Sequence, residues 1–186
     1  TDHISNLSSD TYTYTVIDAN LCTFSNAVTI DQPVEELDVN YSVTDVLCHG
    51  DHTGSIALTP SGGTAPYSYS WANTTFQLSV VSSSLNNFPS EDYIFQVTDS
   101  QGCLISDTLS IQEPDPLSAN FSVTHILCNG DSSGVISTNI AGGNDPYSYV
   151  WTNGAVSGDL EFLPSGNYEL LITDDNNCTI LEQVLV

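Results

Sequence analysis

The sequence predicts an all-β protein built from tandem copies of one small unit. Two observations support this prediction. The first is an internal repeat, in which the segment that begins at Cys48 returns 80 residues later at Cys128. The second is that short runs of β-branched and aromatic residues alternate with turns containing Gly and Pro, and no long stretch has the helical period. A repeat of this regularity is typical of arrays of stacked units.

The two full copies share a Cys-x-Gly-Asp turn, a Gly-Gly pair, a Pro-Tyr-x-Tyr-x-Trp run and a late Asp-x-x-x-Cys. These elements begin at Cys48, Gly62, Pro66 and Asp99 in the first copy, and at Cys128, Gly142, Pro146 and Asp174 in the second. An earlier, partial copy contains Asp18 and Cys22. We therefore expect the C-terminal part of a truncated repeat at 1–34, a full repeat at 35–114 and a full repeat at 115–186, with roughly 75–80 residues in each full unit.

Six runs in the first full unit have strand character. The first alternates in polarity, the second follows a turn with Asp and Gly, the third follows the Gly-Gly loop, the fourth is weak, and the last two form a hairpin. The expected strands are 39–47, 55–59, 67–71, 76–81, 92–98 and 104–111. The sequence is compatible with six or with seven strands in a unit.

Aromatic residues narrow the fold class to tandem immunoglobulin-like β-sandwiches. Trp71 and Trp151 lie in mid-unit strands, where such sandwiches bury a tryptophan. Tyr93 and Tyr168 each follow a Pro-containing corner, where a tyrosine hydroxyl typically bonds to the backbone. The tyrosine pairs 67/69 and 147/149 each share one strand face, which is either part of the core or a platform for glycan.

Composition excludes several classes of function. The chain has 23 acidic residues and neither Lys nor Arg, so it lacks the cations that neutralise phosphates, and we expect no nucleic-acid partner. No apolar run approaches the 18 or so residues that cross a membrane, so we expect no membrane span. The acidity is interpreted as a solubility device or, alternatively, as a surface that recruits divalent cations.

The five cysteines suggest a disulfide in each small unit. Each full copy holds two, and we expect Cys48 to pair with Cys103 and Cys128 with Cys178, whereas Cys22 is expected to be unpaired by truncation. Such bridges imply an oxidising, extracellular setting. The pairing requires six strands in an up-and-down succession, because with seven the two sulfurs lie at opposite ends of the unit, too far apart to bond.

No catalytic motif occurs, so we expect no enzyme. Histidines do not recur between copies, which argues against a His-dependent metal site common to both units. Acidic residues gather where one unit meets the next, and carboxylates at such a junction could bind calcium weakly. The calcium hypothesis rests on Asp31, Glu35, Glu36, Glu113 and Asp115. A solvated linker is the alternative, and then no cofactor is needed.

The repeated motif as a set resembles the SprB repeat of gliding-motility adhesins of Bacteroidetes-type bacteria. The second full unit departs at Asn177, where the family has Gly, and the first departs at Glu91-Asp92, which precede the corner Tyr93. The resemblance implies a very large surface protein that the type IX system exports and that the gliding machinery moves along the cell. Asp107-Thr108-Leu109 also resembles the O-glycosylation triplet of such bacteria, with Thr108 as acceptor.

The function that we expect is therefore a non-enzymatic stalk segment of a secreted cell-surface adhesin that supports adhesion and gliding. Surface polysaccharide or the substratum would be contacted by regions outside this sequence. The alternative is a glycan- or calcium-binding accessory module of a secreted enzyme.

Overall fold

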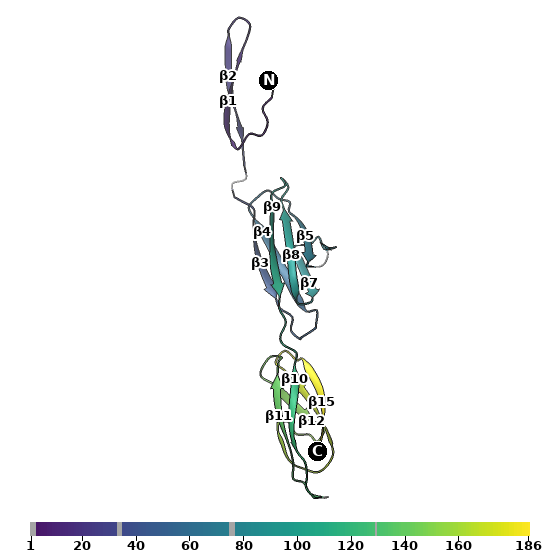
Figure 1. Cartoon of the computed structure of the whole chain (residues 1–186). Coiled ribbons are helices and arrows are strands. Elements are labelled where there is room, and N and C mark those ends of the chain that lie inside the picture. The colour runs from purple at the N-terminus through teal and green to yellow at the C-terminus, as the bar shows by residue number, and fades with distance from the viewer. Residues whose placement is uncertain (1–2, 33–34, 75–76, 129) are drawn as a thin grey trace.

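The computed structural model describes residues 3–32, 35–74, 77–128 and 130–186, in which all regular elements are strands. These strands form an isolated hairpin and two β-sandwiches, which follow one another along a long axis (Figure 1). None of the described elements is a helix long and apolar enough to cross a membrane. The molecule is therefore a rod of successive β units.

The first sandwich consists of two antiparallel sheets, with the strand orders β3-β4-β7 and β6-β5-β8-β9. Its described residues form seven strands, and Ser84–Phe88 is one that the sequence analysis missed. That segment contains two Asn residues, one of which, Asn87, has a φ of 62°. The bounds are β3 (Asp38–Thr44), β4 (Gly54–Ser61), β5 (Ser68–Asn73), β6 (Gln77–Leu78), β7 (Ser84–Phe88), β8 (Glu91–Thr98) and β9 (Leu104–Ile111).

The second sandwich repeats this arrangement, with the sheets β10-β11-β13 and β12-β14-β15. Its described residues form six strands, because a loop takes the place of the two-residue β6. The bounds are β10 (Ser118–Thr124), β11 (Gly134–Ala141), β12 (Ser148–Trp151), β13 (Leu160–Leu163), β14 (Asn167–Thr173) and β15 (Thr179–Leu185). Together with the alternating burial of these strands, the paired sheets confirm the predicted tandem immunoglobulin-like β-sandwiches.

A tryptophan lies at the centre of each core, as the sequence predicts. Trp71 is fully buried and Trp151 is 2% exposed. Each indole N–H donates to a backbone carbonyl, that of Ser82 at 2.8 Å and that of Ser157 at 2.9 Å. Burial of a large ring together with a satisfied polar group explains why a tryptophan suits this position.

The predicted tyrosine corner is present in both sandwiches. Tyr93 Oη donates to the carbonyl of Pro89 at 3.1 Å, and Tyr168 Oη donates to that of Pro164 at 3.0 Å. Burial, followed by the nearby charge of Glu91, raises the pKa of Tyr93 to about 12. The raised pKa widens the alkaline pH range over which the hydroxyl of Tyr93 keeps its proton and can donate.

Removing the corner hydroxyl gives a test of this contact. We expect Tyr93→Phe to lower the stability of the first sandwich by about 1 kcal/mol, because a partly buried hydrogen bond is lost. For a unit of this size, the change corresponds to a fall in Tm of about 4–8 °C. Tyr41→Phe in the same sandwich is the matched control, since the side chain of Tyr41 is 54% exposed. Equal effects of the two substitutions in thermal melts would contradict the assignment.

The isolated hairpin consists of β1 (Asp10–Ile17) and β2 (Thr23–Ile30). Its register pairs Asp10 with Ile30, as β8 and β9 pair Glu91 with Ile111. The hydroxyl of Tyr12 donates to the carbonyl of Ser8 at 3.0 Å, a contact of the same spacing as the tyrosine corner. The hairpin thus has the geometry of the last hairpin of a sandwich, while the domain boundary at 34 falls outside the described residues and stays a prediction.

Candidate functional site: the junction between the sandwiches

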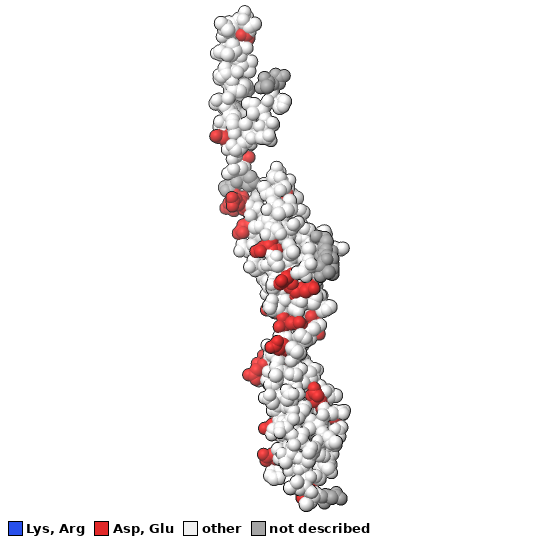
Figure 2. Space-filling model, in the orientation of Figure 1, with Lys and Arg blue, Asp and Glu red and all other residues white. Residues whose placement is uncertain are grey.

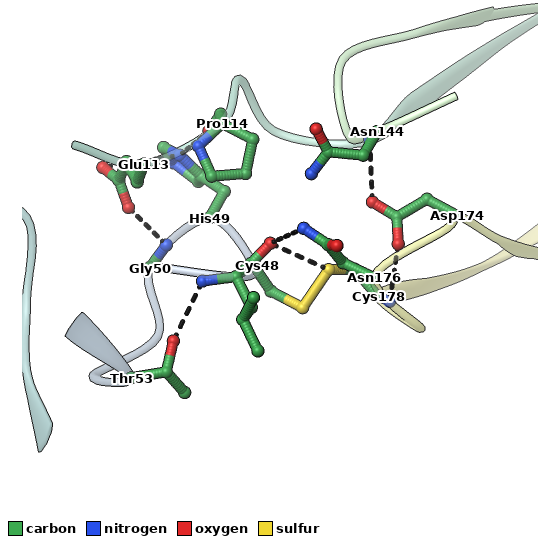
Figure 3. The surroundings of a disulfide bond; sticks show 11 residues. Cys48, His49, Gly50, Thr53, Glu113, Pro114, Asn144, Asp174, Asn176 and Cys178 are labelled. Carbon is green, nitrogen blue, oxygen red and sulfur yellow. Dashed lines mark hydrogen bonds and ion pairs between the residues drawn. A yellow bond between two sulfur atoms is a disulfide. The ribbon is translucent and has the colours of Figure 1, made fainter. Parts of the chain in front are cut away.

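A disulfide joins the two sandwiches. Cys48 of the first unit bonds to Cys178 of the second, with 5.6 Å between their Cα atoms and a separation of 130 residues in sequence. Cys48 follows the first strand of its unit, and Cys178 lies in the turn before the last strand of the next unit (Figure 3). The bridge therefore spans the junction, where the two units meet end to end.

Local hydrogen bonds fix the loop that carries Cys48. The amide of Leu47 donates to Thr53 Oγ1 at 2.9 Å, and the amide of Asp51 donates to the carbonyl of Cys48 at 3.0 Å. Gly50 has a φ of 78°, which suits a residue without a Cβ. The repeated Cys-x-Gly-Asp motif is thus the turn that presents the sulfur at the end of the sandwich.

An aspartate organises the turn that carries Cys178. Asp174 is 4% exposed, and its Oδ1 accepts the amide of Cys178 at 2.8 Å. Within the same turn, the amide of Asn177 donates to the carbonyl of Asp174 at 3.0 Å, and Asn177 has a φ of 66°. Asn tolerates this left-handed conformation better than most residues, so the turn forms without the glycine that the equivalent turn of the first sandwich has at Gly102.

The two turns also contact each other directly. Asn176 Nδ2 donates to the carbonyl of Leu47 at 2.9 Å, a hydrogen bond between units that lies beside the disulfide (Figure 3). Besides the peptide linker, the junction is therefore held by one disulfide and by polar contacts around it.

The linker between the sandwiches is bound to the first unit through Glu113. Its Oε2 accepts the amide of Gly50 at 2.7 Å, and its Oε1 lies 3.5 Å from Nδ1 of His49. The amide of Gly50, then the side chain of Ser90, and to a smaller extent His49 lower the pKa of Glu113, while partial burial opposes them. The carboxylate of Glu113 therefore holds the linker against the first unit by accepting a backbone hydrogen bond.

The Gly-Gly pair binds the linker to the second unit. The amide of Gly143 donates to the carbonyl of Asp115 at 2.8 Å, and the amide of Asn144 donates to Oδ2 of Asp174 at 2.9 Å. Gly142 has a φ of 71°, and a Cβ at this position would lie 2.1 Å from the carbonyl oxygen of Pro116. The linker thus lies so close to the loop that only glycine fits.

The upstream end of the first sandwich has the same construction. The amide of Gly63 donates to the carbonyl of Glu35 at 3.0 Å, and Asp99 accepts the amides of Thr64 at 2.9 Å and Cys103 at 2.8 Å. Burial acts to raise the pKa of Asp99, but hydrogen bonds from the backbone of Thr64, Cys103 and Gln101 outweigh it, so that the pKa is lowered. Each unit therefore has a buried aspartate at its upstream end, Asp99 or Asp174, that accepts backbone amides of the Gly-Gly loop and of the late cysteine.

These lowered pKa values make the junctions sensitive to acid. A carboxylate whose folded pKa is depressed stabilises the protein above its unfolded pKa, and the stabilisation is lost as the pH falls through the folded value. Protonation of the other acids relieves charge repulsion and acts in the opposite direction, so a comparison of variants is needed. We expect Asp99→Asn to lower Tm at pH 7 and the difference from wild type to shrink below about pH 4.

Measurement of Tm against pH for the wild type, Asp99→Asn and Glu113→Gln tests this expectation. Asp107→Asn is the matched control, because the Asp107 side chain is exposed and accepts the amide of the next residue, Thr108. A difference between wild type and Asp99→Asn that stays constant from pH 7 to pH 3 would contradict the role assigned to the carboxylate.

The predicted pairing of cysteines within units is wrong. The structure joins Cys48 to Cys178, and leaves Cys22, Cys103 and Cys128 as exposed thiols. In the first unit, seven strands place Cys48 and Cys103 at opposite ends, as the strand-count argument requires. The second unit has six strands, but the loop at 152–159 returns the chain between β12 and β13, so Cys128 and Cys178 are also at opposite ends.

The five acids of the calcium hypothesis are divided between two places. Asp31, Glu35 and Glu36 lie upstream of the first sandwich, whereas Glu113 and Asp115 lie in the linker after it. In the described part of the chain, no three His, Cys, Asp or Glu side chains come together as ligands for a metal ion. Calcium binding at the junctions stays a prediction.

The other predicted positions lie on the sandwiches. The tyrosines at 67, 69, 147 and 149 are half-buried and pack against the cores, which confirms the core interpretation. The hydroxyls of Tyr67 and Tyr147 donate to the carbonyls of Gly62 and Gly142, at 2.6 and 2.8 Å. Thr108 is exposed on β9, so its side chain is accessible, and glycosylation there stays a prediction.

Sequence reasoning missed Asn176 at the junction, and it assigned no role to Asp174 there or to Asp99 in the equivalent turn upstream. A signal was present for the aspartates, because an Asp stands four residues before the late cysteine in all three copies. That spacing matches a side chain that accepts the cysteine's amide, as Asp18 Oδ1 also does for Cys22 at 2.8 Å. Nothing in one unit's sequence indicates that its first cysteine faces a neighbouring unit.

Comparison with solved structures gives distant similarities. One is to three N-terminal domains of the bacteriophage RB49 Highly Immunogenic Outer Capsid protein (Hoc), with 11% identity, a TM-score of 0.49, and coverage of 81% of this chain and 58% of that one. Another is to an amphioxus IgVJ-C2 molecule, with 12% identity, a TM-score of 0.32, and coverage of 81% and 96%. No curated protein matches the sequence.

Comparison with family models identifies the repeat. The SprB repeat matches residues 40–76 and 120–156, so each match includes the first cysteine of a unit, its Gly-Gly pair and its core tryptophan. The matched segments begin in β3 and β10, at equivalent positions of the two sandwiches. The chain therefore carries two SprB repeats, one in each sandwich.

Proposed function

We propose that this chain is a non-enzymatic, force-bearing stalk segment of a large secreted cell-surface adhesin that supports surface adhesion and gliding. The observation that carries the proposal is the covalent junction, in which Cys48 of one unit bonds to Cys178 of the next. A stalk must withstand tension between units, and the disulfide adds a second covalent connection beside the peptide linker, so that the chain between the two sulfurs is not pulled out.

The surface of the rod supports the same proposal. The face in Figure 2 shows acidic side chains distributed along both sandwiches and no basic ones. The net charge of −23 makes neighbouring segments repel one another, which keeps a stalk extended and separate from other stalks. The charge pattern favours a spacer over a surface that binds acidic polymers.

The family and the disulfide also support an extracellular location. Disulfides form and persist in oxidising environments, and SprB repeats suggest a cell-surface segment. In this proposal, the secretion and gliding machinery and the surface polysaccharide or substratum are contacted by other regions of the parent protein. The type IX system would export it.

A glycan-binding module of a secreted enzyme is the competing function, and the tyrosines argue against it. The side chains that would form the platform pack against the cores, and two of their hydroxyls are used by backbone carbonyls. A glycan platform requires aromatic faces that are open to solvent.

Replacement of the segment in the parent protein tests the proposal. In cells that display the adhesin, we would exchange residues 35–186 for an unrelated tandem β-sandwich of the same length, and in a second strain for a single sandwich. A spacer predicts that the full-length substitute restores attachment to glass and gliding, and that the short one restores less. Loss of attachment with the full-length substitute, despite normal surface display, would indicate a ligand-binding role instead.

A further inference from the structure

The three free cysteines lie at positions equivalent to the two that are bonded. Cys103 stands in the turn before the last strand of its unit, as Cys178 does. In both turns the aspartate four residues earlier accepts the cysteine's amide through Oδ1, at 2.8 Å, and donates its own amide to the cysteine's carbonyl at 3.0 Å. The two cysteines are therefore presented by the same turn.

Cys22 belongs to the same class. Its amide donates to Oδ1 of Asp18 at 2.8 Å, and the amide of Asp18 donates to the carbonyl of Cys22 at 3.0 Å. It lies between β1 and β2, the strands whose register matches that of the last hairpin in the first sandwich. The Asp-x-x-x-Cys turn thus occurs three times, and its cysteine is bonded in one of them, at Cys178.

Cys128 is the counterpart of Cys48. Each follows the first strand of its unit, and each carbonyl accepts the amide of the Asp three residues later, at 3.1 Å for Asp131 and 3.0 Å for Asp51. Cys128 is exposed as a free thiol at the end of the second sandwich that lies away from Cys178. Its sulfur is therefore presented at this end of the second sandwich as that of Cys48 is at the end of the first.

The surroundings of Cys103 also match those of Cys178. Cys178 and Thr179 line a surface hollow at the junction together with the linker residues Pro116 and Leu117. Cys103 and Leu104 line a hollow at the upstream end of the first sandwich together with Glu36 and Leu37, which occupy the same places in the earlier linker. Similar hollows for a bridge therefore lie at both ends of the first unit. The downstream hollow contains both Cys48 and Cys178, whereas Cys103 is the single cysteine among the described residues that line the upstream hollow.

We propose that Cys22, Cys103 and Cys128 are half-sites of unit-to-unit disulfides, whose other halves are cysteines of neighbouring SprB units. Cys128 would bond to the late cysteine of a following unit, and Cys103 and Cys22 to the early cysteines of preceding units. In each reaction, two thiols lose two protons and two electrons to a disulfide oxidant, which is reduced to two thiols, and one sulfur–sulfur bond forms in the protein. A disulfide then crosses every junction of the array, beside the peptide linker.

Such an array carries tension along a short covalent path. Force that enters the first sandwich through β3 reaches Cys48, crosses to Cys178 and leaves through β15, so residues 49–177 are bypassed. Both strands run along the rod, and the path is therefore already close to extended (Figure 1). This inference builds on the proposed stalk function, but its test reads sulfur chemistry and does not depend on adhesion.

An extended chain tests the proposal. Residues 112–186 are appended after Val186, so that Cys128 of the original chain faces a second copy of the turn that carries Cys178. After equilibration with oxidised and reduced glutathione, we expect a second bridge, from Cys128 to the appended late cysteine, and three free thiols, as in the original chain. Alkylation with iodoacetamide and intact mass give the count. Leu181→Val in the appended copy, at a position that is 63% exposed, gives the appended late-cysteine peptide its own mass, so that peptide mapping identifies the pair.

The bridge between Cys48 and Cys178 is the internal control for folding. Cys128→Ser in the original part of the chain should remove the second bridge alone and leave four free thiols. Five free thiols in the extended chain, with Cys128 alkylated, would overturn the proposal, and so would a bond from Cys128 to any other cysteine. Absence of both bridges would overturn it as well, because the junction geometry would then be wrong. None of these outcomes affects the replacement test of the stalk function.

Discussion

Pulling the oxidised chain by its two ends will extend it several hundred ångströms less than pulling the reduced chain. The disulfide closes a loop between residues separated by 130 positions, and an extended chain spans about 3.3–3.6 Å per residue. Tension therefore cannot extract the loop while the bridge is intact, even if both sandwiches unfold. The contour length that the bridge withholds from extension is roughly 430–470 Å.

Single-molecule force spectroscopy measures this difference as total contour length. The double variant Cys48→Ser/Cys178→Ser should give the long extension with or without reductant. Cys103→Ser is the matched control and should keep the short extension when oxidised, because Cys103 is a free thiol. Equal extensions of the oxidised and reduced wild type would contradict a bridge between the units.

Gly142→Ala is expected to be the most damaging single substitution at the junction. The new Cβ would lie 2.1 Å from the carbonyl oxygen of Pro116, in a backbone conformation with a φ of 71°. The left-handed conformation alone costs a residue with a side chain about 1–2 kcal/mol, and the contact with a backbone atom adds to it. We expect the second sandwich to lose about 2 kcal/mol or more, with a fall in Tm of about 10 °C or more.

Gly154→Ala separates strain from steric conflict. Gly154 is in the same sandwich and has a φ of 85°, but an added Cβ would meet nothing within 4 Å. This control should cost only about 1 kcal/mol, and it should leave the bridge between Cys48 and Cys178 intact. If both variants melt at the same temperature and form the bridge equally, the close approach of the linker to Gly142 is not important.

Local sequence patterns were sufficient to predict the units, because each depends on residues close to one another in the chain. The tryptophans, the tyrosine corners and the Gly-Gly loops could all be placed from spacing and turn chemistry. Strand β7 could not be placed in this way. Its sequence Ser-Leu-Asn-Asn-Phe has one buried apolar residue, Leu85, and polar and apolar residues alternate little. Its place in the sheet is fixed by pairing with β4 and not by its own residues.

The cysteine pairing was beyond local prediction for a different reason. Two cysteines in each small unit suggest a bridge within the unit, and the strand count alone decides which end each sulfur occupies. In the second unit, the loop at 152–159 reverses the chain without forming a strand, so counting strands gives the wrong end for Cys178. The partner of Cys48 becomes evident only when the units are placed end to end.

The bonded partners of each cysteine are the most direct test of the junction. Cleavage after glutamate under non-reducing conditions gives one peptide, 37–91, with Cys48 and another, 170–182, with Cys178. Cys103 and Cys128 stay together in a third peptide, 92–161, because the bond between Glu113 and Pro114 resists cleavage. Mass spectrometry should find 37–91 linked to 170–182, with 92–161 free. Linkage of 92–161 to both of the other peptides would show bridges within units and contradict a covalent bond across the junction.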